Sequence, residues 1–377
     1  MKAVISAYAR SPFHFAKKGA LAGVRPDTLA AQVVQGLLAR TDLDPALLED
    51  VILGCAYPEA AQGNNLARIV GLLAGLSHAV PGMTVNRFCG SSMQAVHIAA
   101  AQIEAGMGEA FLCVGVESMT MVPQGGFNFS PNPALAADTA AYISMGETAE
   151  NVAQRWNVSR ADQEQLAVES HRKAAQAREQ GRLRDEIVAI TTEVGETLAI
   201  DGCIRPTTNR DALAALKPAF RPDGVVTAGT SSPLTDGAAA VLVTSDAFAA
   251  KHRLPALARI KSFATVGVDP AVMGIGPIPA TRKALARAGL SVADLDVVEI
   301  NEAFSSQALA CIRELELNPA TVNLDGGGLA IGHPLGATGA RITGKAAALL
   351  VRENGRYALA TQCVGGGQGI ATVLERV

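Results

Sequence analysis

The chain has 377 residues, of which 49% are hydrophobic and only 4% aromatic, and its formal net charge is −3. This length supports two or three domains with sizeable cores, and the composition excludes a disordered chain. A nearly neutral charge argues against nucleic acid as a partner, and the absence of an apolar run of 18 or more residues argues against a membrane span.

The first residues, MKAVISAYARSPF, predict a β-strand, because the apolar run before Arg10 is too short for a secretory signal. The six cysteines are scattered and form no C-x-x-C pair; they are Cys55, Cys89, Cys113, Cys203, Cys311 and Cys363. We therefore expect reduced thiols, no disulfide, no structural metal site and a cytoplasmic location.

The stretch TVNRFCGSSMQAV places a cysteine, Cys89, where a short strand turns into a helix. Residues 83–85 have strand character, and apolar residues then recur at helical spacing as far as Met107. The first turn of a helix favours an anion, so this position predicts a thiol whose pKa drops from about 8.5 toward 7 or below. Cys89 is therefore a candidate nucleophile, although a buried structural cysteine is the simpler interpretation of any single case.

Two segments of the chain follow the same order of elements. Residues 28–56 predict an amphipathic helix, an acidic turn and a strand, and residues 279–303 repeat that order. Thr-Val-Asn then recurs in both halves, at residues 84–86 and 321–323, and each copy precedes a helix and a strand. The repeat predicts an α/β fold of two duplicated halves in pseudo-twofold arrangement, with mixed, mainly parallel sheets.

Residues 118–240 do not fit the repeat and predict an inserted loop domain. Residues 1–117 with 241–252 would form the first half, and residues 253–377 the second. The insert contains a polar helical run from Glu147 to Gln180 and many basic residues. Such charges usually mark a solvated helix face, but a long insert on a symmetric scaffold is also where a large substrate would be held.

Three further glycine-rich segments place polar residues at strand ends. EINEAF puts Asn301 after a strand, GGGLAIGHPLGATGAR puts His333 in a loop before a proline, and TQCVGGGQG puts Cys363 at a strand end. A single residue of this kind is more often structural. Their shared position, with Cys89, at the edge where ligands bind α/β sheets favours an active site.

These segments, together with VTAGTSSPLTDGAAA and VGVDPAVMGIGPIPA, closely resemble the thiolases over residues 4–377 and in the family's order. The resemblance implies a five-layered αβαβα fold with two duplicated halves and a loop domain. It also implies an acyltransferase that cleaves 3-ketoacyl-CoA with CoA. CoA is a substrate, so no cofactor and no metal are expected.

By this resemblance Cys89 carries the acyl group as a thioester, and His333 activates Cys89 and donates to the substrate thioester oxygen. Cys363 is the second acid/base, and Asn301 holds a water that completes that oxyanion site. The backbone N–H groups of Cys89 and Gly365 form a second oxyanion site. This chemistry needs such parts, because cleavage expels a carbanion that must be stabilised as an enolate, and preorganised donors lower such a barrier by about 3–4 kcal/mol each.

For the substrate, the family pattern places Ser232 near the pantetheine arm and Arg205 near the CoA nucleotide, while Met145 and Phe304 line the acyl path. The chain departs from acetoacetyl-CoA thiolases at Ser144, where those enzymes commonly have histidine. This change favours a degradative 3-ketoacyl-CoA thiolase of β-oxidation over an acetyl-CoA C-acetyltransferase that works in the condensing direction.

Two other classes remain open from the sequence. A cysteine-dependent thioesterase would use Cys89 and His333 with water as acceptor, which leaves Asn301 and Cys363 without a role. A non-catalytic CoA- or lipid-binding member of the fold would not need the four polar residues Cys89, Asn301, His333 and Cys363. The expected partners are CoA, 3-ketoacyl-CoA and a second copy of the chain, as a homodimer or homotetramer. A dehydrogenase/hydratase subunit, as in multienzyme β-oxidation complexes, is a further candidate.

Overall fold

The structure, a computed structural model, describes the backbone of residues 1–377 and every side chain except that of Asp138. Strands and helices alternate from the start of the chain. The first part contains β1 (Ala3–Arg10), β2 (His14–Phe15), α1 (Pro26–Leu38), β3 (Asp50–Gly54), α2 (Leu66–Leu73), β4 (Gly82–Val85), η3 (Phe88–Gly90), α3 (Ser91–Glu104) and β5 (Ala110–Ser118).

The middle of the chain is richer in helices and turns. It contains α4 (Pro133–Asp138), α5 (Met145–Arg155), α6 (Arg160–Glu179), β6 (Ile190–Thr191), β7 (Thr197–Leu198), α7 (Arg210–Ala214), β8 (Thr235–Ser245) and α8 (Asp246–Lys251). The last part contains β9 (Ala258–Gly267), η5 (Pro270–Ile275), α9 (Pro277–Ala288), β10 (Val297–Ile300), α10 (Ser305–Glu314), α11 (Gly328–Ile331), α12 (Leu335–Arg352), β11 (Tyr357–Val364) and β12 (Gln368–Glu375).

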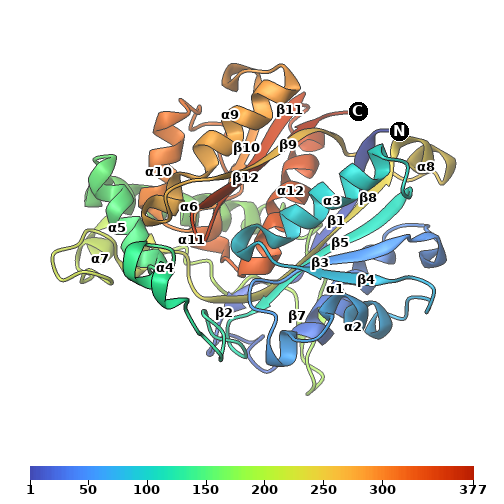
Figure 1. The fold of residues 1–377 in the computed structure, drawn as a ribbon, viewed down its shortest axis with the longest axis horizontal. Helices are drawn as coiled ribbons and strands as arrows, with labels where there is room; N and C mark the ends of the chain where they lie inside the picture. The colour runs from blue at the N-terminus through green and yellow to red at the C-terminus, as the bar shows by residue number, and fades with distance from the viewer.

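The main sheet consists of two runs of strands that meet at one short contact. One run has the order β4-β3-β5-β8-β1 and the other the order β10-β11-β12-β9. They join where β1 pairs with β9 through only two residue pairs, Val4 with Arg259 and Ile5 with Ala258. Each half of the chain therefore builds its own sheet (Figure 1).

The two sheets follow one plan, which confirms the predicted duplication. In each, a parallel pair, β3 with β5 or β10 with β11, is followed by two antiparallel neighbours, β8 and β1 or β12 and β9. The place that β4 takes beside β3 is taken in the second half by a short parallel bridge between Val298 and Val322.

The sheet is mixed, as expected, but antiparallel pairs outnumber parallel ones across the described backbone. Among the pairs of strands, only β3–β4, β3–β5 and β10–β11 are parallel, besides isolated parallel bridges such as that between Val298 and Val322. Tight connections between consecutive strands cause this antiparallel pairing. In the second half, Gly365–Gly367 join β11 to β12 in a hairpin, which makes the two strands antiparallel. Gly366 and Gly367 have positive φ values of 75° and 82°, which glycine adopts without strain.

The elements stack in five layers, αβαβα, as Figure 1 shows from top to bottom. Helices α9 and α10 cover the outer face of the second sheet, and α1 and α2 cover the outer face of the first. Helices α3 and α12 lie between the sheets and pack against each other. The largest hydrophobic cluster fills this central layer and takes residues from both sheets.

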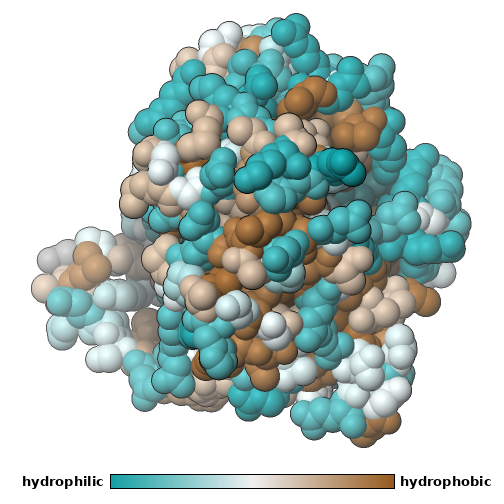
Figure 2. All heavy atoms as spheres, turned by 90° about the vertical axis from the view of Figure 1, so that its right-hand side faces the viewer, coloured by the Kyte–Doolittle hydropathy of each residue, from teal (hydrophilic) through white to brown (hydrophobic). Residues whose placement is uncertain are grey.

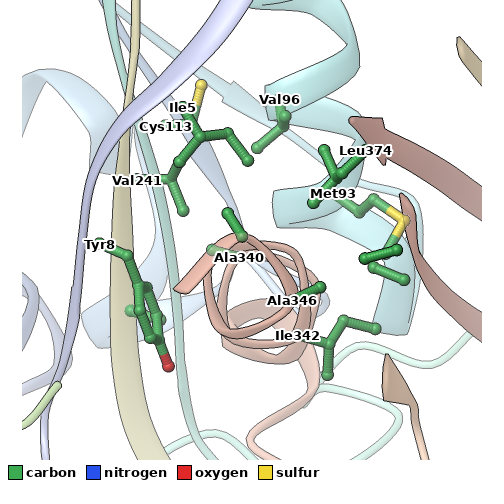
Figure 3. Packing of buried hydrophobic residues seen from close by; sticks show 14 of the residues in the cluster. Ile5, Tyr8, Met93, Val96, Cys113, Val241, Ala340, Ile342, Ala346 and Leu374 are labelled. Carbon is green, nitrogen blue, oxygen red and sulfur yellow. The ribbon is translucent and has the colours of Figure 1, made fainter. Parts of the chain in front are cut away.

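The central helices have small side chains at their contacts, which lets backbone approach backbone. Figure 3 shows Ala340, Ile342 and Ala346 of α12 among side chains of the first sheet and of α3, with Leu374 of β12 nearby. The closest approach is at Gly339, where an added Cβ would lie 2.3 Å from the backbone nitrogen of Met93 in α3. The position of α12, which begins beside the candidate site, therefore depends on a residue without a side chain.

Replacing Gly339 with alanine should destabilise the protein by about 2–3 kcal/mol through overpacking. The gain of about 1 kcal/mol in helix propensity that alanine brings offsets only part of this cost. The control is Gly23→Ala, because a Cβ at Gly23 meets no atom within 4 Å and should change stability by less than about 0.5 kcal/mol. Urea unfolding measures both variants, and equal midpoints would contradict the close approach of α3 and α12.

The segment between β5 and β8 forms a separate helical region that packs at the ends of the sheets. Helix α6 contacts α10 and α11, and α5 contacts α10 and η5. The single helical run expected from Glu147 to Gln180 is wrong, because the segment forms two helices. Asn157 takes a positive φ of 51°, and the Ser159 hydroxyl accepts a hydrogen bond from the N–H of Asp162 to begin α6.

A buried ionic cluster ties this helical region to both halves. Arg10 of β1 pairs with Asp201 at 2.7 Å and with Glu186 at 2.8 Å, and its side chain is fully buried. Lys345 of α12 pairs with the same Glu186 at 2.9 Å and with Asp325 at 2.7 Å. Since Glu186 of the insert pairs with a cation from each half, the cluster fixes three parts of the chain together.

Both termini lie at the amino ends of the parallel strands. They are close together at the right of Figure 1, and Figure 2 shows that side of the molecule, with hydrophobic residues gathered near its centre among hydrophilic ones. The carboxyl ends of β3, β5, β10 and β11 point the other way, toward the insert. No helix in the described part of the chain is both long and apolar enough to cross a membrane.

Candidate active site

Cys89 lies at the junction between β4 and α3, as the sequence predicted. It is the middle residue of the short helix η3, and its neighbour Phe88 has a positive φ of 43°. Gln362 of β11 donates its side-chain amide to the backbone carbonyl of Cys89 at 2.6 Å. A strand of the second half therefore holds the cysteine loop of the first.

The expected lowering of the Cys89 pKa is wrong for the structure without substrate. Only 7% of Cys89 is exposed, and this burial raises the pKa of the thiol to about 11. Hydrogen bonds from the backbone N–H groups of Gly365 and of Cys89 itself oppose the rise but do not cancel it. The rise in pKa caused by desolvation is therefore larger than the lowering that the helix N-terminus provides. Cys89 is thus a neutral thiol that needs a base before it can attack.

His333 lies between the short helix α11 and Pro334, which caps α12. Its backbone N–H donates to the hydroxyl of Thr235 at 3.1 Å, which fixes the loop on β8. Burial, and next the charge of Arg341, lower the pKa of the imidazole to about 3. His333 is therefore neutral at physiological pH and can accept a proton.

Asn301 and His333 are in direct contact. Asn301 follows β10, and its backbone N–H donates to the Thr361 carbonyl of β11 at 3.0 Å. Its side-chain Nδ2 lies 3.3 Å from Nε2 of His333. Both side chains are buried, so the pair presents an amide and an imidazole at the carboxyl end of the second sheet.

Cys363 lies near the end of β11, opposite Gly369 of β12, and is completely buried. Burial raises the pKa of its thiol well above the ordinary value, and the charge of Cys89 raises it further. A thiol in this state holds its proton until a strong base appears next to it. The residues on either side of Cys363 contact the Cys89 loop: Gln362 donates to the Cys89 carbonyl, and Val364 lies 2.9 Å from the position that a Cβ would take on Gly90. The two cysteines therefore lie on adjoining segments, one from each half.

The side wall next to Cys363 is apolar. Met145 at the start of α5 and Phe304 before α10 belong to one hydrophobic cluster with Cys363. The Met145 sulfur also lies 3.7 Å from the position that a Cβ would take on Gly365. Ser144, where the sequence departs from acetoacetyl-CoA thiolases, caps α5 by accepting a hydrogen bond from the N–H of Glu147.

Ser232 and Arg205 lie farther along the surface of the insert. The backbone N–H of Ser232 donates to the Ala303 carbonyl at 2.9 Å, which places it beside Phe304. Arg205 stacks over the ring of Phe15 at 4.9 Å and is exposed. It borders a cavity of about 490 Å³ lined by Ile204, Arg205, Pro206, Thr207, Thr208, Ala212, Leu213 and Leu216. No contact joins Arg205 to Cys89, His333, Asn301 or Cys363 among the described side chains.

A buried carboxylate, which the sequence analysis missed, connects the loops around Cys89. Glu117 at the end of β5 accepts hydrogen bonds at 2.8 Å from the N–H of Ala56, the N–H of Gly336 and the side chain of Gln62. Gly336 lies three residues after His333, so Glu117 links the loop after β3 to the first turn of α12. The sequence offered one signal for this role: Glu117 is the single charged residue in the mostly apolar strand AFLCVGVES, and a buried charge needs partners.

Among the residues that the structure describes, no group of three or more His, Cys, Asp or Glu side chains is arranged to hold a metal ion. The site supplies reactive groups of its own. It has a thiol, Cys89, which shares a hydrophobic cluster with Leu335, two residues after His333. It also has the His333 imidazole, a second thiol that retains its proton, and backbone and amide donors. Such a set can form a covalent acyl intermediate and stabilise a carbanion.

Two family models together match almost the whole chain. The model of the N-terminal thiolase domain matches residues 3–247, and the model of the C-terminal thiolase domain matches residues 254–376. This chain belongs to the thiolase family. Thiolases are acyltransferases, and CoA is one of their substrates.

Known thiolases match the chain over nearly its whole length. It is 49% identical to a 3-ketoacyl-CoA thiolase of Saccharophagus degradans, with 99% of this chain and 98% of the relative covered. It is 46% identical to a 3-ketoacyl-CoA thiolase of Bacillus subtilis, with 99% of each covered. The crystal structure of human mitochondrial 3-ketoacyl-CoA thiolase superimposes with a TM-score of 0.92 at 35% identity, covering 100% of this thiolase and 99% of that chain.

Proposed function

We propose that this thiolase cleaves 3-ketoacyl-CoA with CoA, giving acetyl-CoA and a shortened acyl-CoA in fatty acid β-oxidation. The observation that carries the proposal is that two buried thiols, Cys89 and Cys363, lie on adjoining segments from opposite halves of the fold, which Gln362 and Val364 hold in contact. The names of the similar proteins supply the substrate class. A hydrolase that uses water as acceptor has no need of the second thiol.

In the first step Cys89 attacks the 3-keto carbon while its proton moves to Nε2 of His333. Proton transfer accompanies attack, because burial keeps both the thiol and the imidazole neutral beforehand. The N–H groups of Cys89 and Gly365 are the donors for the oxyanion that forms on the former keto oxygen. Preorganised donors of this kind lower a barrier by about 3–4 kcal/mol each.

In the second step the bond between carbons 2 and 3 breaks and the acyl group stays on Cys89. The electron pair moves into the thioester enolate, whose oxygen is stabilised by protonated His333 and by a water on Asn301. Cys363 gives its proton to carbon 2 and completes acetyl-CoA. The raised pKa of Cys363 suits this role, because the thiol is still protonated when the enolate forms.

In the last step the Cys363 thiolate takes the proton of the incoming CoA thiol, which attacks the acyl group on Cys89. The Cys89 sulfur leaves and recovers its proton from His333. Every proton is thus returned, and neither a redox partner nor a metal enters the cycle. CoA serves as a substrate and no cofactor is required.

The substrate would extend from this centre toward the insert, residues 118–240, which we propose as the CoA-binding domain between the halves 1–117 with 241–252 and 253–377. Met145 and Phe304 would border the acyl path, and Ser232 the pantetheine arm. Arg205 would approach the CoA phosphates, since its charge borders a cavity of about 490 Å³. We further propose a cytoplasmic homodimer or homotetramer, alone or beside a dehydrogenase/hydratase subunit.

A chain-length series tests this function. Incubation with CoA and 3-ketoacyl-CoAs of four to sixteen carbons should give acetyl-CoA and the shortened acyl-CoA beyond four carbons, because the wall near Cys363 is apolar. Mass spectrometry of the products measures the rate for each length. Activity confined to four carbons would instead indicate an acetoacetyl-CoA thiolase. Faster hydrolysis than transfer to CoA would indicate a thioesterase.

A further inference from the structure

Thr338, in the first turn of α12, contacts the candidate base from behind. Its hydroxyl Oγ1 lies 2.6 Å from Nδ1 of His333 and 3.0 Å from the carbonyl oxygen of Pro334. The side chain is completely buried, so no solvent competes for either contact. The ring of His333 is thus held at Nδ1 by Thr338 and at Nε2 by Asn301.

These contacts decide which ring nitrogen carries the proton of the neutral imidazole. A hydroxyl has one proton, and the carbonyl of Pro334 can only accept; a Thr338 proton directed to that carbonyl leaves an oxygen lone pair to face His333. Nδ1 must then be the donor of the 2.6 Å bond. At the other side the amide Nδ2 of Asn301 donates to Nε2, which must therefore be unprotonated. Both hydrogen bonds are made together by one tautomer, with the proton on Nδ1.

We propose that Thr338 is a positioning residue that holds His333 as the Nδ1–H tautomer. Nε2 is then unprotonated, and it accepts the proton of the Cys89 thiol when the 3.3 Å contact with Asn301 gives way. With the opposite tautomer Nε2 would already carry a proton, and the imidazole could not act as the base at that atom. The tautomer is a property of the protein without substrate; only its use in catalysis rests on the proposed function.

The proton balance follows from this assignment. When the S–H bond of Cys89 breaks, its proton forms a bond to Nε2, and the imidazolium keeps its Nδ1–H bond to Thr338. When acyl transfer to CoA releases the Cys89 sulfur, the proton returns from Nε2 and the Nδ1–H tautomer is restored. Thr338 neither gains nor loses a proton, so it acts only through the orientation and protonation of the ring.

The same helix provides a matched control. Thr343 is also buried in α12, and its hydroxyl also donates to the carbonyl four residues earlier, that of Gly339, at 2.7 Å. It makes no hydrogen bond to His333. Replacing either threonine with valine keeps the shape and removes the hydroxyl. Any difference between the two variants therefore reports the contact with the imidazole.

The tautomer can be measured directly in the substrate-free protein. Long-range proton–nitrogen NMR spectra of protein labelled with ¹⁵N-histidine distinguish a protonated ring nitrogen from an unprotonated one, and His333→Gln identifies the signals of His333. We expect a protonated Nδ1 and an unprotonated Nε2 at neutral pH. A protonated Nε2 would overturn the proposal, and this result requires no variant at Thr338.

Thr338→Val should leave His333 as a mixture of tautomers and lower kcat by about 10- to 100-fold, with little change in KM. This loss is smaller than the roughly 10²–10⁴-fold that a general base supplies, because part of the imidazole keeps the active tautomer. Thr338→Ser should restore both the spectrum and kcat, and Thr343→Val should resemble the wild type. An unchanged tautomer and kcat in Thr338→Val would refute the role of Thr338. The expected spectrum in a protein that lacks thiolase activity would refute the proposed function and leave the tautomer assignment intact.

Discussion

Replacing Cys89 with alanine should lower kcat by about 10⁴-fold or more, as losses of nucleophiles in other enzymes do. The other thiol of the site, Cys363, cannot replace it, because burial holds its pKa well above the ordinary value. Mass spectrometry of wild-type protein mixed with an acyl-CoA should find one acyl group on Cys89 and none on Cys89→Ala.

Cys113→Ala is the control for this experiment. Cys113 lies buried in the middle of β5. Its replacement removes a sulfur atom outside the site, so kcat should stay close to the wild-type value. Cys89→Ser should accumulate little acyl-enzyme, because an alkoxide is far harder to form than a thiolate. Normal turnover by Cys89→Ala, or an acyl group on another cysteine, would exclude Cys89 as the nucleophile.

Replacing Lys345 with methionine should destabilise the protein by about 3–5 kcal/mol, the usual cost of removing one partner from a buried ion pair. Methionine nearly preserves the volume of lysine but leaves Glu186 and Asp325 facing each other without their shared cation. Urea unfolding measures the loss. Lys283→Met, which changes an exposed lysine on α9, should shift stability by less than about 0.5 kcal/mol.

The pH dependence of stability gives a second measure of this cluster. Burial alone would raise the pKa values of Glu186 and Asp325, but Lys345, with Arg10 or Arg352, holds both below their usual values. Their contribution is therefore complete above the unfolded pKa values near 4 and is lost as the pH falls through the lowered ones. Lys345→Met should weaken this acid dependence. Equal acid sensitivity in the two proteins would contradict the pairing.

Local patterns were sufficient to predict the general plan of the molecule. The position of Cys89 between a strand and a helix follows from apolar spacing and from the glycine and serines behind it. The duplicated order of elements is visible because each half repeats a helix, a strand and a Thr-Val-Asn segment. These features depend on neighbours within a few residues, which is the range over which sequence patterns are informative.

Features that depend on distant partners were missed or misjudged. Helical periodicity predicts the helix N-terminus that lowers the pKa of Cys89, but it cannot show the burial that raises this pKa further. That burial comes from residues of the second half, such as Gln362. The ionic cluster joins Arg10 to Glu186 and Glu186 to Lys345, which are far apart in the sequence. The break between α5 and α6 was visible only as an Asn-Val-Ser segment, a weak signal inside a strongly helical composition.

The arrangement of the two chain ends has a practical consequence. Because β1 begins and β12 finishes on the side remote from the insert, a label, surface linker or fused protein attached at either end projects away from the cysteines. Immobilised enzyme would keep the carboxyl ends of its parallel strands turned outward whichever end were tethered. The nearness of the ends also makes a circularly permuted chain feasible, with new ends placed in an exposed turn and the old ones bridged by a short peptide.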